Sequence, residues 1–239
     1  MQVFKDSRSL KRDARESLLG NLTTAVLSIF LYMLAASVLA EMIAGFNLGS
    51  PILSLILSVI IYFVINTCGN MLRIGLSYVF LRLQYRKGAR IGDLFTAFRA
   101  NSDAAVIVSA FVAILELFCM LPLIILLSLL SLEGRQSYLL LIIVLFTAGY
   151  AASFAVHIRY SMVPYLFLDF PQLTPEELLR GSVKLISGHK MRLFRLCLSF
   201  LPLHLLTAIS FGVVGLWVSS YFHAAEAAFY KDLMENITF

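Results

Sequence analysis

Residues 104–130 read AAVIVSAFVAILELFCMLPLIILLSLL, an apolar run that contains a single charged residue, Glu116. About 20 apolar residues in a helix are enough to cross the hydrocarbon core of a bilayer, and this run exceeds that length. Because lipid offers no partner for backbone N–H and C=O groups, such a run forms a helix there. The stretch therefore predicts a transmembrane helix.

The rest of the chain repeats this pattern. Five more apolar segments lie at about residues 22–44, 52–81, 138–167, 192–210 and 212–230. The chain is 60% hydrophobic and 14% charged, whereas soluble domains are about half apolar and a quarter charged. Its mean hydropathy is +0.87. We expect an all-α fold, a polytopic membrane helix bundle with about six transmembrane helices, as a single transmembrane domain over residues 1–239.

The direction of the spans follows from the positions of Lys and Arg, which are enriched in short cytoplasmic connections. Sixteen of the 19 basic residues lie near the two chain ends or in the connections around residues 82–99 and 180–195. On the opposite side lies Arg135 alone. We therefore expect both termini in the cytoplasm. Since topology spreads the basic residues, they form no phosphate footprint, and nucleic acid is not an expected partner.

Three amphipathic stretches separate the apolar pairs, at residues 7–19, 91–101 and 174–187. The third opens with TPEE, a capping box with proline at the first helical position, and Gly188 supplies a stop signal. We expect the second and third stretches to lie along the cytoplasmic surface as helices. Their apolar faces consist of Leu94, Phe95 and Phe98, and of Leu178, Leu179, Val183 and Ile186.

Each amphipathic stretch precedes two apolar segments, which predicts three pseudo-repeated hairpins, each preceded by a cytoplasmic amphipathic helix. The repeats cover about residues 7–86, 90–170 and 174–232. Their returning segments are also similar locally. RIGLSYVFL at residues 73–81 matches RYSMVPYLFL at residues 159–168, with SYF at residues 220–222 as a shorter third copy.

Ionisable residues within apolar segments are costly in lipid, so each is a candidate for pairing or for function. The candidate intramembrane polar network consists of Arg73, Glu116, Arg159, His204, His223 and Glu226. The two arginines can extend to the cytoplasmic surface, or one of them can pair with the carboxylate of Glu116 inside the bundle. The two histidines and the last carboxylate form either a metal or proton site, or ordinary hydrogen bonds between helices.

Enzyme motifs such as GxSxG, HExxH and the P-loop do not occur, and we expect no catalytic residue, metal or cofactor. Cys68, Cys119 and Cys197 lie in apolar runs without CxxC spacing, which is typical of small buried side chains.

One long segment and three shorter ones resemble a known family. Residues 159–200 read RYSMVPYLFLDFPQLTPEELLRGSVKLISGHKMRLFRLCLSF, and residues 216–230 read LWVSSYFHAAEAAFY. SRSLKRDARESLLGN at residues 7–21 and GARIGDLFTAF at residues 88–98 also match. The chain resembles a group of uncharacterised bacterial integral membrane proteins defined by a domain of unknown function. More distantly, it resembles the membrane portion of some glycerophosphodiester phosphodiesterases, without their soluble catalytic barrel.

The resemblance implies a location in the bacterial cytoplasmic membrane and carries no reaction. We expect a non-enzymatic integral membrane protein that acts through lipid or through a membrane protein partner, as an accessory, scaffold or stress-response component. Anionic lipid is a candidate partner because basic amphipathic helices attract it, and a homo-oligomer is another. The alternative is a small transporter or channel-like protein that uses Arg73, Glu116, Arg159 and the His204, His223 and Glu226 group. An intramembrane enzyme acting on lipid is a third class.

Overall fold

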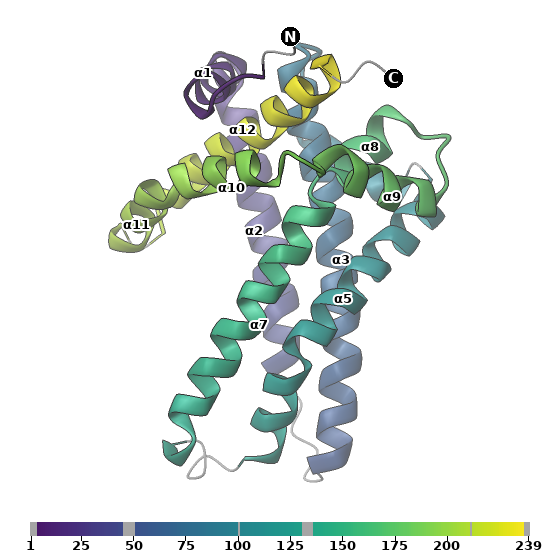
Figure 1. The fold of residues 1–239 in the computed structure, drawn as a ribbon, viewed down its shortest axis with the longest axis vertical. Coiled ribbons are helices and arrows are strands. Elements are labelled where there is room, and N and C mark those ends of the chain that lie inside the picture. Colours follow the sequence, from purple (N-terminus) through teal and green to yellow (C-terminus); the bar gives the residue numbers. More distant parts are fainter. Residues whose placement is uncertain (1–3, 45–50, 100, 131–135, 211, 237–239) are drawn as a thin grey trace.

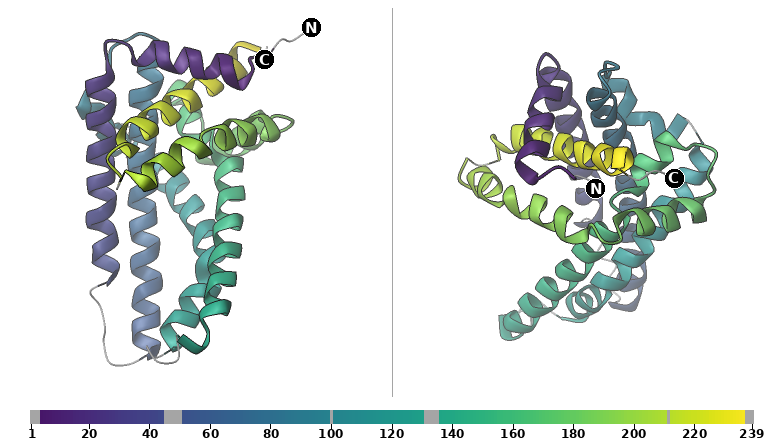
Figure 2. Two further views of the ribbon diagram at one scale, coloured as in Figure 1. Left: turned by 90° about the vertical axis from the view of Figure 1, so that its left-hand side faces the viewer. Right: turned by 45° about the horizontal axis from the view of Figure 1, so that its top comes forward.

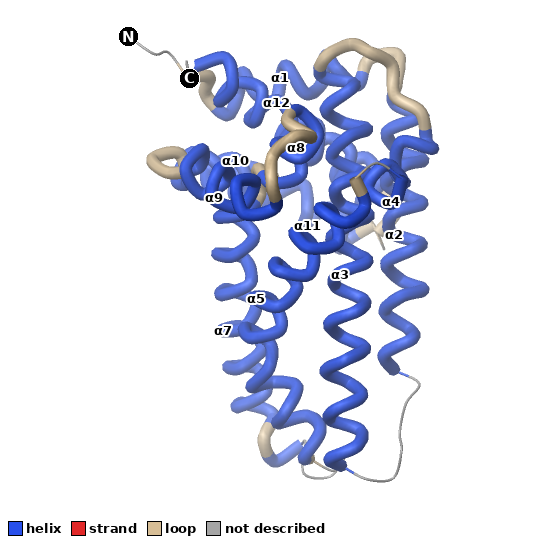
Figure 3. Tube along the Cα trace, turned by 90° about the vertical axis from the view of Figure 1, so that its right-hand side faces the viewer, coloured by secondary structure: helices blue, strands red, loops and turns tan. Residues whose placement is uncertain are grey.

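The computed structural model describes residues 4–44, 51–99, 101–130, 136–210 and 212–236, and each regular element in these ranges is a helix (Figures 1 and 3). The prediction of an all-α fold is confirmed. In chain order the elements are α1 (Ser7–Leu18), α2 (Leu22–Ala44), α3 (Pro51–Gln84), the 3-10 helix η1 (Ile91–Phe95), α4 (Thr96–Arg99), α5 (Ser102–Leu129), α7 (Leu139–Tyr160), α8 (Val163–Asp169), α9 (Pro175–Ile186), α10 (Lys190–Ser199), α11 (Leu201–Ile209) and α12 (Gly215–Asn236).

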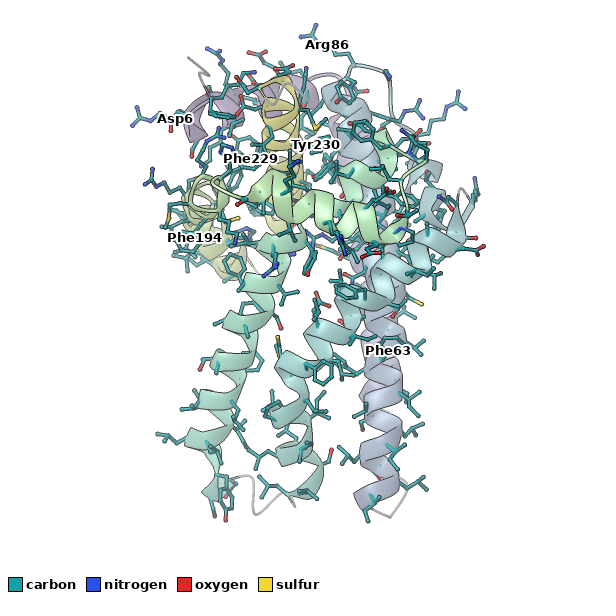
Figure 4. The ribbon with its side chains drawn as sticks, turned by 45° about the vertical axis from the view of Figure 1, so that its right-hand side comes forward. Asp6, Phe63, Arg86, Phe194, Phe229 and Tyr230 are labelled. Carbon is teal, nitrogen blue, oxygen red and sulfur yellow. The ribbon has the colours of Figure 1, made fainter. Side chains whose placement is uncertain are left out.

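The long helices α2, α3, α5 and α7 run side by side and form the lower part of the molecule in Figure 1 and in the left view of Figure 2. In the most apolar windows of the α3, α5 and α7 segments, only 6% of the residues are buried by protein. Phe63, labelled in Figure 4, lies on this lower part of α3. Apolar surface on this scale is unusual for a helix in water and typical of one in lipid.

The other helices except α11 gather at one end of the long ones, where they form what we call the capping layer: α1, η1, α4, α8, α9, α10 and α12. The largest fully buried side chains lie here or on the adjoining ends of the long helices, among them Phe80, Tyr165, Phe229 and Tyr230. Figure 4 shows the last two inside this layer. Both chain ends lie at its outer side (Figure 2). The protein core thus sits at one end of the bundle.

The three amphipathic stretches are helices, as predicted: α1, η1 with α4, and α9. At the start of α9, the Thr174 N–H donates to Glu177 Oε2 at 2.8 Å, and the Glu177 N–H donates to the threonine hydroxyl at 3.4 Å. Gly188 follows the helix with a φ of +83°, a conformation that glycine adopts at little cost. Leu178 and Ile186 are buried, so the apolar face of α9 packs on the bundle.

The apolar face of the second stretch is divided. Leu94 is 1% exposed, whereas Phe95 and Phe98 are 42% and 43% exposed. The buried side is held by a close approach of η1 to α3. A Cβ on Gly75 would lie 1.7 Å from the carbonyl oxygen of Leu94. Glycine at this position is therefore what lets the two helices touch.

The prediction of six spans is not confirmed. Within the described residues, four helical segments are long and apolar enough to cross a membrane: Ile52–Gln84, Ser102–Leu129, Leu139–Asp169 and Lys190–Ile209. A fifth is added if Ser7–Leu18 and Leu22–Val38, which meet at a 99° bend, count as one. The predicted sixth segment, residues 212–230, falls outside this group because α12 carries Glu226, Lys231 and Asp232. The repeat organisation is not confirmed either.

The fifth predicted segment has an unexpected direction. Helices α10 and α11, which together we call the lateral arm (residues 190–209), run crosswise to the four long helices, and α12 returns from the tip of the arm to the capping layer (Figures 1 and 2). No residue of α11 is buried. Large apolar side chains are exposed along the arm: Met191, Phe194, Leu198, Leu201, Leu205, Leu206 and Ile209.

Candidate functional site

Arg73 stands at the junction between the long helices and the capping layer. Its side chain is 18% exposed. Its Nη2 lies 2.9 Å from Nε2 of His157 on α7, and its Nη1 lies within hydrogen-bond distance of the other ring nitrogen. The same Nη2 donates to Oε1 of Glu226 on α12 at 3.4 Å. One guanidinium therefore ties together α3, α7 and α12.

Glu226 is the most deeply buried of these groups, with 3% of its side chain exposed. Its other oxygen, Oε2, lies 3.4 Å from Nδ1 of His223, one turn earlier on α12. The His223 ring stacks on Phe80 of α3 with centroids 5.7 Å apart. A carboxylate removed from water needs such partners, because desolvation alone would cost several kcal/mol. We call Arg73, His157, His223 and Glu226 the Arg73 cluster.

The structure brings together three of the six residues of the predicted network, namely Arg73, His223 and Glu226. Glu116 on α5 is half-buried near Asn70 and Arg73, but among the described residues Arg73 pairs with Glu226 and not with Glu116. Arg159 is exposed at the end of α7. His204 is exposed on the lateral arm, 6.0 Å ring to ring from Phe222.

His157 is the member of the cluster that the predicted network lacked, because a histidine near the end of an apolar segment is typical of a boundary residue. A relevant signal was its closeness in sequence to Arg159, which begins the segment similar to the one that begins with Arg73. That signal does not show which face of α7 turns toward α3. The rotation of packed helices decides this contact.

A small cavity of about 30 Å³ adjoins the cluster and is lined by Asn70, Arg73, Ser109 and residues around Tyr160. Ser109 Oγ is buried in the described structure without a hydrogen-bond partner, and Asn70 Nδ2 is buried beside the Glu116 carboxylate. Two polar atoms beside a cavity of this size leave room for about one water molecule. The polar region therefore extends from the cluster toward α5, where Glu116 lies.

Two further polar junctions hold the capping layer together. In the first, Arg192 Nη2 lies 2.7 Å from Oδ2 of Asp232, which is 1% exposed, and donates to the Lys5 carbonyl at 2.9 Å. In the second, the Tyr230 hydroxyl donates to Asp169 at 2.8 Å, and the Tyr85 hydroxyl donates to the same oxygen at 3.4 Å. Burial and the neighbouring Asp169 raise the pKa of Tyr85 to about 12 and also raise the pKa of Tyr230. Both hydroxyls therefore remain donors near neutral pH.

The chemistry open to the Arg73 cluster is pairing and proton exchange. In the part of the chain that the structure describes, no three His, Cys, Asp or Glu side chains converge in a way that could hold a metal ion. His204 is exposed on the arm, and no described contact joins it to the His223–Glu226 pair. What the arrangement does provide is a buried charge pair that fixes α12 against two of the long helices, α3 and α7.

The chain belongs to a family described as a protein of unknown function (DUF975), whose model matches residues 1–237. This confirms the resemblance to an uncharacterised family over essentially the whole chain. No curated protein and no solved structure matches the chain. The similarity to the membrane portion of glycerophosphodiester phosphodiesterases is not shown.

Proposed function

We propose that this protein is a non-enzymatic, multi-pass protein of the bacterial cytoplasmic membrane that acts through lipid of the cytoplasmic leaflet. In this proposal α2, α3, α5 and α7 cross the membrane, and the capping layer lies at the cytoplasmic side with both termini. The third predicted hairpin does not cross. Its first half, the lateral arm, lies in the leaflet beside the bundle.

The observation that carries the proposal is the exposure of the arm. Leu201, Leu205 and Ile209 of α11 are 51%, 60% and 75% exposed, and Leu198 of α10 is 53% exposed. The arm leaves the bundle at the junction with the capping layer (Figure 1), which is where the headgroup and upper acyl regions of one leaflet would lie. Burying these side chains in acyl chains stabilises them by about 1.5–3 kcal/mol for each fully covered leucine.

The distribution of charge supports the orientation. The capping layer and the connections next to it carry the basic residues identified from the sequence, among them Arg82, Arg86, Lys184 and Lys231. Arg86 lies at the outer edge of this end in Figure 4. Anionic headgroups of the cytoplasmic leaflet attract such residues by about 1 kcal/mol for each one near the surface.

An arm inserted into one leaflet adds area to that leaflet alone, and such insertions respond to curvature and lipid packing.

Depth-dependent fluorescence quenching tests the proposal. A single cysteine replaces Leu205, the cysteines at 68, 119 and 197 are changed to alanine, and the site is labelled with NBD in bilayers that contain doxyl lipids. We expect strong quenching by doxyl groups near the headgroups and little by a nickel chelate in water. Quenching mainly by the aqueous chelate would show that the arm lies in water and not in lipid. Maximal quenching by doxyl groups at the bilayer centre would favour a crossing helix. Tyr138, at the far end of the bundle, is the matched control site.

The alternative function, a small transporter, draws support from the Arg73 cluster, which combines two histidines and a carboxylate with an arginine. Such groups can relay protons through a membrane protein. The cavity beside Arg73 has a volume of about 30 Å³, too small for an organic substrate. A proton flux in proteoliposomes that the Glu226→Gln variant abolishes would favour this function over the first.

A further inference from the structure

A groove at the base of the lateral arm combines two cations with an apolar floor. It encloses about 420 Å³ between the end of α7 and the start of α10. Arg159 and Lys190 stand at its polar side, while Val156, Met191 and Phe194 supply much of its apolar surface. We propose that this groove binds one anionic phospholipid, with the phosphate between Arg159 and Lys190 and one acyl chain along the apolar floor.

Both walls of the groove are fixed by packing. The ring of Phe154 on α7 meets that of Phe194 on α10 edge to face, with centroids 6.3 Å apart. The carbonyl of Arg159 accepts a hydrogen bond from Ser182 on α9 at 3.1 Å, and that serine is fully buried. The backbone segments that carry the two cations are therefore held in place, and lipid binding has to order only the two exposed side chains.

The positive charges of the groove are complementary to the phosphate of an anionic phospholipid. Arg159 and Lys190 are exposed, and neither forms an ion pair with a carboxylate of the described residues. A phosphodiester brings one negative charge and two oxygens, which a guanidinium can bind through two parallel N–H groups. A free phosphate would leave the apolar floor uncovered. The floor is what assigns the groove to a lipid.

Arg159 thereby gains a role that its sequence position left open. It lies near the end of an apolar segment and outside the Arg73 cluster, where an arginine stem can run along apolar surface while its head reaches the headgroups. This inference rests on the proposed function, because it needs the groove to face the cytoplasmic leaflet. The NBD measurement on the arm and the lipid measurement below can fail separately.

Competition between two lipids of identical chains tests the site. The purified full chain in detergent receives dioleoylphosphatidylglycerol or dioleoylphosphatidylcholine, and bound lipid is measured by native mass spectrometry. We expect the wild type to prefer the anionic lipid. The preference should fall about fivefold for each cation removed in R159Q and K190Q, following the attraction of one basic residue for an anionic headgroup. The double variant R99Q/K184Q removes the same charge from exposed residues outside the groove and should lower the preference clearly less than R159Q/K190Q.

A charge-preserving exchange, R159K/K190R, guards against a folding defect and should retain most of the preference. Glycerol 1-phosphate should not displace the lipid. Three results would overturn the site: no preference in the wild type, equal losses in R159Q/K190Q and R99Q/K184Q, or displacement by glycerol 1-phosphate. If the lipid site fails while NBD at position 205 still reports the cytoplasmic leaflet, the proposed function stands and the groove does not.

Discussion

Arg73 and Glu226 are 153 residues apart in the chain, and they meet with Nη2 of the arginine 3.4 Å from Oε1 of the glutamate. The contact joins the helix that forms the centre of the bundle to the last helix of the chain. It is the one ion pair in the described residues that links one of the long helices to α12. The contact fixes α12, the helix that follows the lateral arm, against the bundle.

Removing one partner of the pair should be costly. We expect Glu226→Gln to lower the free energy of unfolding in mild detergent by about 3 kcal/mol, because it leaves a poorly hydrated guanidinium without its carboxylate. Arg73→Gln should have a similar effect, and the double variant should lose clearly less than the sum. The matched control is Glu176→Gln, since Glu176 pairs with Arg180 and both are at least 71% exposed. Its loss should stay below about 0.5 kcal/mol.

Glu116 should behave differently from Glu226. Since the carboxylate on α5 forms no ion pair with Arg73 in the described structure, changes at Glu116 and Arg73 should add within about 0.5 kcal/mol. Glu116→Gln combined with Arg159→Gln should add in the same way. The measurement is a double-mutant cycle on the free energy of unfolding. A coupling above about 1 kcal/mol in either cycle would restore the sequence-based hypothesis that Glu116 pairs with an arginine.

The contrast between these two carboxylates shows how far the sequence could predict the site. His223 and Glu226 are three residues apart, and helix geometry alone placed them on one face. Arg73 and Glu116 were candidates for the polar network because each is charged within an apolar run. Which carboxylate meets Arg73 depends on where α12 docks, and local patterns do not contain that information.

The fold likewise has parts that local sequence patterns predict and parts that depend on long-range packing. The bounds of α9 followed from a capping box and a stop at Gly188, and α1 followed from its basic, amphipathic sequence, all of which act within a few residues. The long helices followed from apolar length. The lateral arm did not, because residues 192–210 are apolar enough to cross a membrane whichever way they point. Their direction is decided by the return of α12 into the capping layer, where residues 224–230 are all buried.

Alanine substitutions at two glycines of α3 distinguish the effect of helix packing on stability from the effect of helix propensity. Gly75→Ala places a methyl group 1.7 Å from the Leu94 carbonyl oxygen, so η1 must move away from α3, and we expect a loss of about 2 kcal/mol in the free energy of unfolding. Nothing lies within 4 Å of a Cβ at Gly69, so Gly69→Ala should be neutral or stabilise by up to about 1 kcal/mol. Thermal unfolding in detergent distinguishes the two. Equal effects would contradict the close contact of η1 with α3.

The Arg192–Asp232 junction should hold the start of the chain in place. Arg192→Gln removes the 2.7 Å contact with Asp232 and the 2.9 Å bond to the Lys5 carbonyl. We expect the amides of residues 5–10 to exchange hydrogen about tenfold faster, which corresponds to about 1.4 kcal/mol of lost protection. Lys231→Gln, which disrupts a weaker, more exposed contact with Glu235 at 3.9 Å, is the control and should change little. Unchanged exchange in Arg192→Gln would show that α1 packing alone anchors this segment.

Labelling of the arm tip distinguishes a lateral arm that enters one leaflet from an arm that crosses the membrane. Single cysteines replace Val213, Tyr138 or Lys184, exposed residues at the tip, at the far end of the bundle and on α9, in a variant with the native cysteines changed to alanine. Intact bacterial cells are treated with a membrane-impermeant maleimide. We expect labelling at 138 from outside, labelling at 184 only after permeabilisation, and none at 213 from outside. Labelling at 213 from outside, as strong as at 138, would mean that the arm crosses the membrane and would contradict its placement in one leaflet.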